Sequence, residues 1–238
     1  VQDQLGDSTI SKWMFKKVAK RAKKIIVLNE LSRAWVWRET GYSAIVIPNF
    51  IDEQFVAASK KKRTVEIKEV FFAGHLLESK GIKEMITVAE NNPDVHFTFA
   101  GVYTKEMKKI LDKDNITLLG DVDHKTVLDN LDKSDLYLFL SHTEGFSISL
   151  LEAMARGIPS LVSNVGANAD MVKDCGGIVV DAKDTRAAMD GFKSVRQLTA
   201  ENYDAIARAE IKKVKMCYTT DVVLDRLTDL YRGMQDGK

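Results

Sequence analysis

Short apolar segments alternate with helix-like segments along most of this chain, from about residue 70 to residue 180. Apolar runs predict strands at 70–73, 95–99, 116–119, 136–140, 160–162 and 177–180. Helical spacing of apolar residues predicts helices near 81–91, 104–112, 124–132, 147–156 and 168–173. Short apolar strands that alternate with helices are typical of a parallel sheet with both faces covered. The sequence therefore predicts an α/β fold with a Rossmann-like parallel sheet.

The two ends of the chain lie outside this alternating region. Before it, the pattern predicts a helix with a basic face at 8–22, a strand at 24–28, a helix at 30–40 and a strand at 44–47. After it, we expect helices at 184–196, 200–216 and 219–235. The polar stretch 57–66 contains the run KKKR and is typical of a connection. We therefore divide the chain into segments 1–52, 53–66, 67–217 and 218–238.

The composition indicates a globular protein and excludes several classes. The 238 residues are 45% hydrophobic, and a net charge of +1 gives no global basic excess that would favour nucleic acid. Two cysteines, Cys175 and Cys217, are too few for a disulfide framework and suggest a reducing compartment. No apolar run approaches the roughly 20 residues needed to cross a bilayer, so we expect a cytoplasmic protein. The histidines show no metal-ligand spacing, and we expect no metal site.

Glycine or polar residues follow four consecutive predicted strands. These residues are Gly74, Gly101, Gly120 and the segment 141–144. Ligands of open parallel sheets bind at the carboxyl ends of the strands. At the third strand end, a flat base could lie against the backbone of Leu119 and Gly120. Each of these positions, taken singly, is also explained as a plain strand exit.

The first strand end continues into the segment FFAGHLLESKGI. Gly74 would let a ligand approach the backbone closely, and Lys80, at the start of the next helix, could reach a diphosphate. His75 could donate a hydrogen bond to a phosphate or could lie exposed beside it. A lysine at a helix start is more often simply solvated, so this segment does not establish a phosphate site by itself.

The segment SHTEGFSISLLEAMARGIPSLVS, residues 141–163, places two glutamates eight positions apart across a predicted loop-to-helix junction. Gly145 follows Glu144, and we expect the helix to start near Ser147. Unpaired N–H groups at a helix N-terminus favour a phosphate or sugar hydroxyls. Glu152 stands among apolar neighbours, where an unpaired charge is costly. Its partner could be the hydroxyls of a ribose, or a backbone or basic group inside the protein.

These segments, with VIPNFID (46–52), FAG (99–101) and LLG (118–120), resemble the donor-binding half of a family-4 retaining glycosyltransferase with the GT-B architecture. The resemblance covers residue 44 to about residue 180. That architecture has two Rossmann-like domains with the active cleft between them. The resemblance implies that 67–217 is the donor-binding domain, that 1–52 is the end of the N-terminal acceptor domain with a crossover, that 53–66 is a linker, and that 218–238 is a C-terminal helix.

The resemblance also implies roles for individual residues. Glu144 would contact the donor sugar, Glu152 would hold the ribose hydroxyls, and Lys80 would bind the diphosphate. Gly145 and Phe146 would offer backbone N–H groups to the sugar and diphosphate. The complete set of expected donor-binding residues is Gly74, His75, Lys80, Gly101, Leu119, Gly120, Glu144, Gly145, Phe146, Ser147 and Glu152. The chain departs from the family's usual pattern at His75, where arginine is common, and at Tyr103 and Ser147, where glycine is common.

The family's chemistry implies transfer of a sugar from a nucleotide diphosphate sugar, such as a UDP- or GDP-sugar, with retention of configuration and without a metal. We expect no cofactor. Catalysis would then consist mainly of electrostatic stabilisation of the leaving diphosphate and of an oxocarbenium-like sugar. Lys80 and Glu144 are the expected catalytic residues: Lys80 supplies positive charge, and Glu144 orients the sugar without acting as a nucleophile.

The expected partners follow from the same resemblance. A glycan or lipid-linked acceptor would bind through the N-terminal domain, of which the chain carries only the end. The chain starts at Val1 without an initiator Met, which suggests a piece of something longer. We therefore expect nucleotide binding but little or no sugar transfer by this chain alone. The basic helix with Trp13, Met14 and Phe15 either touches anionic lipid at the inner face of a membrane or packs on the missing domain.

Two other functions remain open at this point. The chain could be a non-catalytic nucleotide-binding or interaction module, such as one subunit that completes its site with a separate acceptor-domain protein. It could also belong to a nucleotide-sugar epimerase of similar two-domain shape. An epimerase would carry acid-base residues around the sugar, and we identify none in the sequence.

Overall fold

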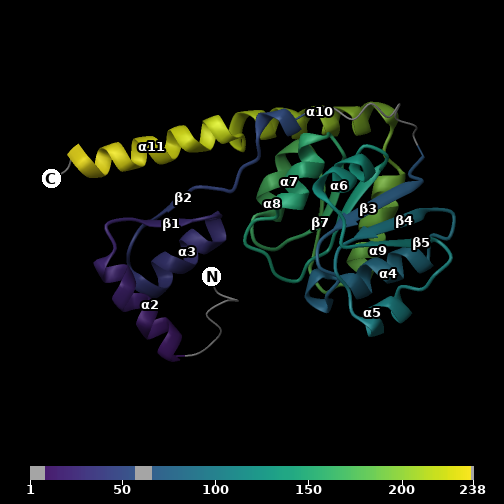
Figure 1. Cartoon of the computed structure of the whole chain (residues 1–238), viewed down its shortest axis with the longest axis horizontal. Coiled ribbons are helices and arrows are strands. Elements are labelled where there is room, and N and C mark those ends of the chain that lie inside the picture. Colours follow the sequence, from purple (N-terminus) through teal and green to yellow (C-terminus); the bar gives the residue numbers. More distant parts are fainter. Residues whose placement is uncertain (1–8, 57–65, 237–238) are drawn as a thin grey trace.

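The computed structural model describes residues 9–56 and 66–236, and it divides them into a large α/β unit and a small N-terminal unit (Figure 1). The large unit contains a six-stranded parallel sheet. Its strands are β3 (Glu69–Ala73), β4 (His96–Ala100), β5 (Ile116–Gly120), β6 (Leu136–Phe139), β7 (Ser160–Ser163) and β8 (Ile178–Val180). The predicted parallel sheet is confirmed, with strand ends within one or two residues of those expected.

The strand order of this sheet is β5-β4-β3-β6-β7-β8. The chain starts at the central strand β3, moves outward to β5, returns to β6 beside β3, and then moves outward on the other side. The order therefore reverses between β3 and β6. In open parallel sheets, such a reversal leaves a crevice at the carboxyl ends of the two strands, because their connections leave toward opposite sides.

Helices cover both faces of the sheet, as expected for a parallel sheet. The helices of this unit are α4 (Ile82–Glu90), α5 (Lys105–Ile110), α6 (His124–Leu131), α7 (Ile148–Ala155), α8 (Asn168–Val172), α9 (Thr185–Arg196) and α10 (Ala200–Cys217), and α11 (Thr220–Asp236) follows them at the end of the chain. Helix α4 packs against α9, and α7 packs against α10. Short 3₁₀ turns lie at η1 (Glu53–Phe55), η2 (Glu78–Lys80) and η3 (Lys173–Cys175). The helix predicted at 81–91 therefore follows a separate turn that contains Lys80.

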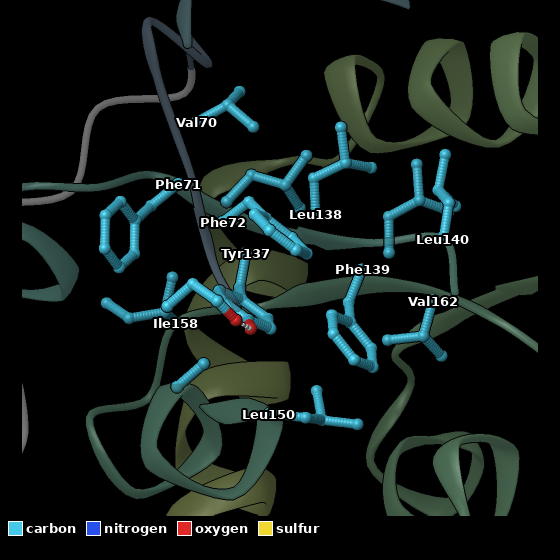
Figure 2. Close-up of a cluster of buried hydrophobic side chains, with 14 of the residues drawn as sticks. Val70, Phe71, Phe72, Tyr137, Leu138, Phe139, Leu140, Leu150, Ile158 and Val162 are labelled. Atoms are coloured by element: carbon cyan, nitrogen blue, oxygen red, sulfur yellow. Dashed lines mark hydrogen bonds between the residues drawn. The ribbon is translucent and has the colours of Figure 1, made fainter. Parts of the chain in front are cut away.

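The core between the sheet and α7 is aromatic (Figure 2). Phe72 of β3 stacks on Phe139 of β6 with ring centroids 5.9 Å apart, and Tyr137 stacks on Phe139 at the same distance. Tyr137 and Phe139 point toward the side of Leu150 and α7, because alternate residues of a strand face the same side. Full burial of one large apolar side chain contributes about 1.5–3 kcal/mol. This packing fixes α7 against β6, one of the two strands between which the order reverses.

The N-terminal unit consists of α2 (Thr9–Arg21), β1 (Ile25–Val27), α3 (Glu30–Thr40) and β2 (Ala44–Val46). The two strands pair in parallel and share a small core with α3, made of Val27, Trp35, Val36 and Ala44. Helix α11 runs away from the large sheet and over this unit (Figure 1). The fold thus combines a Rossmann-like sheet with a small second unit.

The chain passes from the N-terminal unit to the large unit after β2. After β2 the chain passes through Ile51, which forms a parallel bridge with Thr219 between α10 and α11. The linker expected at 53–66 begins with η1, and its residues 57–65 lie outside the described residues. Among the described residues, no helix is both long enough and apolar enough to span a bilayer.

Candidate active site

A cavity of about 460 Å³ opens at the carboxyl ends of β3, β4 and β6, at the point where the strand order reverses. Ligand pockets for small molecules commonly have volumes of this order. Eight of the residues predicted from the sequence line it: Gly74, His75, Lys80, Gly101, Glu144, Phe146, Ser147 and Glu152. The cavity thus brings together side chains from segments that lie far apart in the chain.

The floor of the cavity is backbone, at the ends of β3 and β4. The Gly74 N–H donates to the Ala100 carbonyl oxygen over 2.9 Å, and the Gly101 N–H donates to Gly120 over 2.7 Å. At Gly101 the φ angle is +138°, and a Cβ there would collide with the Gly74 carbonyl. Glycine is therefore required for this close approach. His75 follows Gly74 and is exposed at the rim.

The N-terminus of α7 forms the opposite wall. Ser147 is its N-cap residue, and the Ser147 hydroxyl accepts a hydrogen bond of 3.2 Å from the Leu150 N–H. The helix starts at Ile148, which confirms the start predicted near Ser147. The first N–H groups of a helix have no partner within the helix and carry partial positive charge. This end of α7 therefore offers donors to a negatively charged group in the cavity.

Lys80 and Glu144 form an ion pair across the cavity, between Lys80 Nζ and Glu144 Oε1. The lysine comes from η2 and the glutamate from the loop that follows β6. Their side chains are 27% and 11% exposed, so both charges are partly removed from water. Each charge is thus neutralised by the other. A ligand that binds one of the two side chains must therefore also offer an interaction to the second.

Glu152 lies on α7, about one turn below its N-terminus, and its side chain is 11% exposed. Its Oε1 atom is 2.7 Å from Nε2 of His124, which begins α6. Burial raises the pKa of Glu152 above its ordinary value, and the hydrogen bond and charge of His124 offset part of that rise. The structure thus gives Glu152 a basic partner inside the protein, which is one of the two kinds of partner left open by the sequence. Its second oxygen makes no hydrogen bond with His124.

The sequence did not identify His124 or Ser149 as site residues, although both line the cavity. The His124 ring packs edge-on against Phe55 at 5.0 Å between centroids. The buried Tyr137 hydroxyl bonds to Ser149 over 2.7 Å, and Ser149 lies 3.2 Å from the Ser147 hydroxyl. Burial raises the pKa of Tyr137, so it remains a neutral donor. A histidine directly after the strand end LLGDVD was the available signal for His124.

Three predicted residues lie beside the cavity without lining it. Leu119 and Gly120 end β5, and the Gly120 carbonyl accepts the hydrogen bond from Gly101. The Gly145 carbonyl accepts from Asn29 Nδ2 over 2.6 Å and from the Ala167 N–H over 3.1 Å. Gly145 thereby ties the Glu144 loop to the N-terminal unit.

The part of the chain that the structure describes contains no group of three or more His, Cys, Asp or Glu side chains placed to hold a metal ion. The charged groups that do line the cavity are Lys80, Glu144, Glu152, Asp121 and two histidines, His75 and His124. The arrangement can therefore offer a cation and helix N–H groups to phosphate, and carboxylates to hydroxyl groups.

Comparisons with solved structures show the same fold. Sucrose-phosphate synthase from Thermosynechococcus elongatus matches 100% of this chain and 65% of its own, with a TM-score of 0.84 and 16% identity. The Anabaena protein HepE in complex with UDP and glucose matches 94% of this chain and 67% of its own, with a TM-score of 0.81 and 16% identity. At such identities the likeness shows the fold alone, which is that of the GT-B glycosyltransferases.

Sequence comparisons show the family. Protein CapJ of Staphylococcus aureus is 34% identical over 107 residues, which is 43% of this chain and 27% of CapJ. The chain thus spans only about a quarter of this relative. The model of the family described as "Glycosyl transferases group 1" matches residues 54–212, which is well over half of the chain and includes every residue that lines the cavity. The chain therefore belongs to the group 1 glycosyl transferases.

Proposed function

We propose that this chain is the donor-binding part of a retaining glycosyltransferase that uses a nucleoside diphosphate sugar. One observation carries the proposal: a single cavity at the point where the strand order reverses contains Lys80, Glu144, Glu152 and the N-terminus of α7. Each of these groups matches one part of such a ligand. A cation and helix N–H groups suit a diphosphate, and two carboxylates suit a ribose and a sugar.

In this proposal the ligand takes the place of the two internal pairs, Lys80–Glu144 and His124–Glu152. Lys80 leaves Glu144 and binds the diphosphate together with the N–H groups at the start of α7. Glu144 then accepts hydrogen bonds from the hydroxyls of the sugar, and Glu152 accepts from the ribose. The cavity loses these two internal pairs but gains charge-assisted hydrogen bonds, which are stronger than neutral ones.

The same groups would favour bond cleavage. When the bond between the sugar and the diphosphate breaks, negative charge grows on the leaving phosphate, and Lys80 and the α7 N-terminus lie where they stabilise it. The acceptor attacks from the face that the diphosphate leaves, and its proton passes to the leaving phosphate. Configuration is thus retained, with no covalent sugar on Glu144. The reaction needs no metal, because protein groups supply the positive charge.

We propose a UDP-sugar as the first donor to test. HepE, which has the same fold, was solved with UDP and glucose. The base would lie toward the end of β5, near Asp121, Val122 and the backbone of Leu119 and Gly120. Contacts with backbone groups do not identify the base by themselves, so GDP and ADP belong in the same test.

A glycan or lipid-linked acceptor would bind through a further N-terminal domain of the whole protein. The surface of α2 fits either that domain or an anionic membrane: Trp13 and Met14 are 55% and 57% exposed, and Lys17 lies 3.8 Å from the Trp13 ring. Phe15, by contrast, packs on Trp35 and belongs to the small core. Sedimentation with anionic vesicles at low salt separates the two, because only membrane contact gives binding that salt removes.

A thermal-shift and calorimetric panel of UDP, GDP and ADP tests the proposal. A nucleotide present at 100 times its Kd stabilises the folded chain by about 2.7 kcal/mol, a rise of several degrees in Tm. Lys80→Met and Glu152→Ala should each weaken this response. The proposal fails if no nucleotide stabilises the wild-type chain. If nucleotide binds but the whole protein transfers no sugar to any acceptor, the chain is instead a non-catalytic binding module.

A further inference from the structure

A second buried acidic residue, Glu84, pairs with His142 behind the cavity. Glu84 lies in the first turn of α4, and its Oε1 atom is 3.0 Å from His142 Nε2 in the loop after β6. The two side chains are only 9% and 13% exposed. The other carboxylate oxygen, Glu84 Oε2, is buried and has no hydrogen-bond partner among the described residues. Neither side chain lines the cavity.

The pair joins the two segments that carry the charged residues of the cavity. Lys80 ends η2, directly before α4, and Glu144 lies two residues after His142. The same segments also meet through the backbone, since the His142 N–H donates to the Ser79 carbonyl over 2.8 Å. Gly81 has a φ of +72°, and a Cβ there would collide with the Leu140 carbonyl. The contacts thus form a series, with Glu84–His142 at one end and Lys80–Glu144 at the other.

Stability alone does not explain a buried acidic residue at this position. Removing a carboxylate from water is costly, and replacing a buried ion pair with apolar side chains is often neutral or stabilising. The backbone contact and the close approach of Gly81 already hold the segments together. An apolar pair would fill the same space. Only a hydrogen bond, with its preferred distance and angle, would also fix the orientation of the two segments relative to each other.

We infer that Glu84 and His142 are positioning residues, which hold the Lys80 turn and the Glu144 loop in the arrangement that a nucleoside diphosphate requires. This inference rests on the proposed function. The Lys80–Glu144 ion pair cannot do this in the complex, because the ligand separates the two charges. The Glu84–His142 bond lies outside the cavity and persists when the ligand binds. It keeps Glu144 facing the sugar after Lys80 has turned to the diphosphate.

The inference is tested by measuring how substitutions at Glu84 and His142 change the affinity for UDP. Glu84→Met keeps the volume and removes the hydrogen bond, and it should weaken UDP binding about tenfold, a coupling typical of neighbouring groups, with Tm unchanged or raised. Glu84→Gln keeps an acceptor for His142 and should bind UDP nearly as the wild type does. His142→Leu should reproduce the loss, and the Glu84→Met/His142→Leu double variant should be no weaker than either single variant.

The control is Glu78→Gln. Glu78 lies on η2 and pairs with Lys83 over 2.6 Å, but both side chains are about two-thirds exposed, at 66% and 65%. Exposed pairs contribute little, so UDP affinity should stay at the wild-type value. The coupling is measured in a Lys80→Met background, where Glu84→Met should cost less than about twofold in UDP affinity. Lys80 is then gone, and UDP lacks the sugar that Glu144 would contact.

The outcomes separate the inference from the proposed function. If wild-type chain does not bind UDP, or if Lys80→Met binds it as well as the wild type does, the proposed function has failed. If Lys80→Met weakens binding but Glu84→Met and His142→Leu do not, the inference alone is wrong. It is also wrong if Glu84→Gln loses as much affinity as Glu84→Met, or if the full loss persists in the Lys80→Met background.

Discussion

Glu152 is a buried carboxyl whose cost of burial is only partly offset by its partner His124. Its carboxylate is 11% exposed on a helix whose neighbouring residues are buried, and His124, 48% exposed, is its hydrogen-bond partner. Burial raises its pKa more than His124 lowers it. The ionised form is therefore held less favourably in the folded chain than in water. Ligand hydroxyls that donate to this carboxylate would lower that cost, so a residue that opposes folding can favour binding.

The substitution Glu152→Gln should separate these two effects. Gln keeps the shape and removes the buried charge, and His124 is exposed enough to find water instead. We expect the free energy of unfolding to stay within about 1 kcal/mol of the wild type or to rise. UDP affinity should fall about tenfold or more, since charge-assisted hydrogen bonds are lost. Urea unfolding and calorimetry check the two values, and a destabilised variant that keeps its affinity would contradict the argument.

The raised pKa of Glu152 also predicts how binding depends on pH. A carboxyl whose pKa is higher in the folded chain than in the unfolded chain contributes stability below its unfolded pKa, and that stability is lost as the pH rises through its folded pKa. Protonation of Glu152 in acid thus stabilises the folded chain. Ribose hydroxyls favour the ionised form, so UDP affinity should decrease as the pH falls through the folded pKa.

Calorimetric titrations with UDP across the acid range measure this dependence. Glu152→Gln is the control, because the same UDP phosphate titrates in both experiments but the variant has no titrating carboxyl at this position. The difference between the two pH profiles isolates Glu152. Identical profiles would show that Glu152 does not bind the ligand in its ionised form.

At the scale of the element, α7 connects the core to the cavity. Its buried residues pack on the sheet, while its first N–H groups face the cavity. Ser147 holds that end in place: its hydroxyl accepts from Leu150 and lies beside Ser149, which Tyr137 contacts from the core. The end of the helix that would meet the diphosphate is therefore oriented by side chains below it.

Ser147→Ala should lower both stability and nucleotide affinity. Loss of an N-cap hydroxyl costs about 1 kcal/mol, and a frayed first turn presents its N–H groups less well to a phosphate. Thr199→Ala is the matched control, because Thr199 caps α10 by accepting from Asn202 over 3.2 Å and does not line the cavity. It should lower the stability similarly and leave UDP affinity unchanged. Equal affinity losses in both variants would assign the effect to general destabilisation.

Much of each element could be predicted from the sequence, because strand and helix periodicity are local properties. Glycines marked the ends of several strands, and the helix that became α7 was expected to start near Ser147. Strand order could not be predicted, since it depends on which strands pair. The partners of the charged residues were also missed: His124 is 28 positions from Glu152, and Glu84 is 58 from His142. Only the reversal of order beside β3 brings such segments together.

At the scale of the whole molecule, the two units differ in how much core supports them. The six-stranded sheet has an extensive buried core, whereas β1 and β2 have three residues each and share a small one. A two-stranded sheet is marginal without further packing. Leu31 and Trp37 of α3 are 58% and 60% exposed, so the N-terminal unit leaves apolar surface in contact with water.

Native-state hydrogen exchange should therefore show two levels of protection. Amides of β1 and β2 should exchange through openings of lower free energy than amides of β3 and β6, because fewer buried contacts must break.

Asn29 connects the units, since its Oδ1 accepts from Ser32 and its Nδ2 donates to the Gly145 carbonyl. Asn29→Ser keeps a helix cap but is too short to reach Gly145. It should lower the protection of β1 and β2 and leave β3 and β6 unchanged, as mass spectrometry of the exchanged peptides can measure. Equal protection of both sheets in the wild-type chain would mean that the two units open together. Unchanged protection of β1 and β2 in Asn29→Ser would mean that the small unit does not depend on this contact.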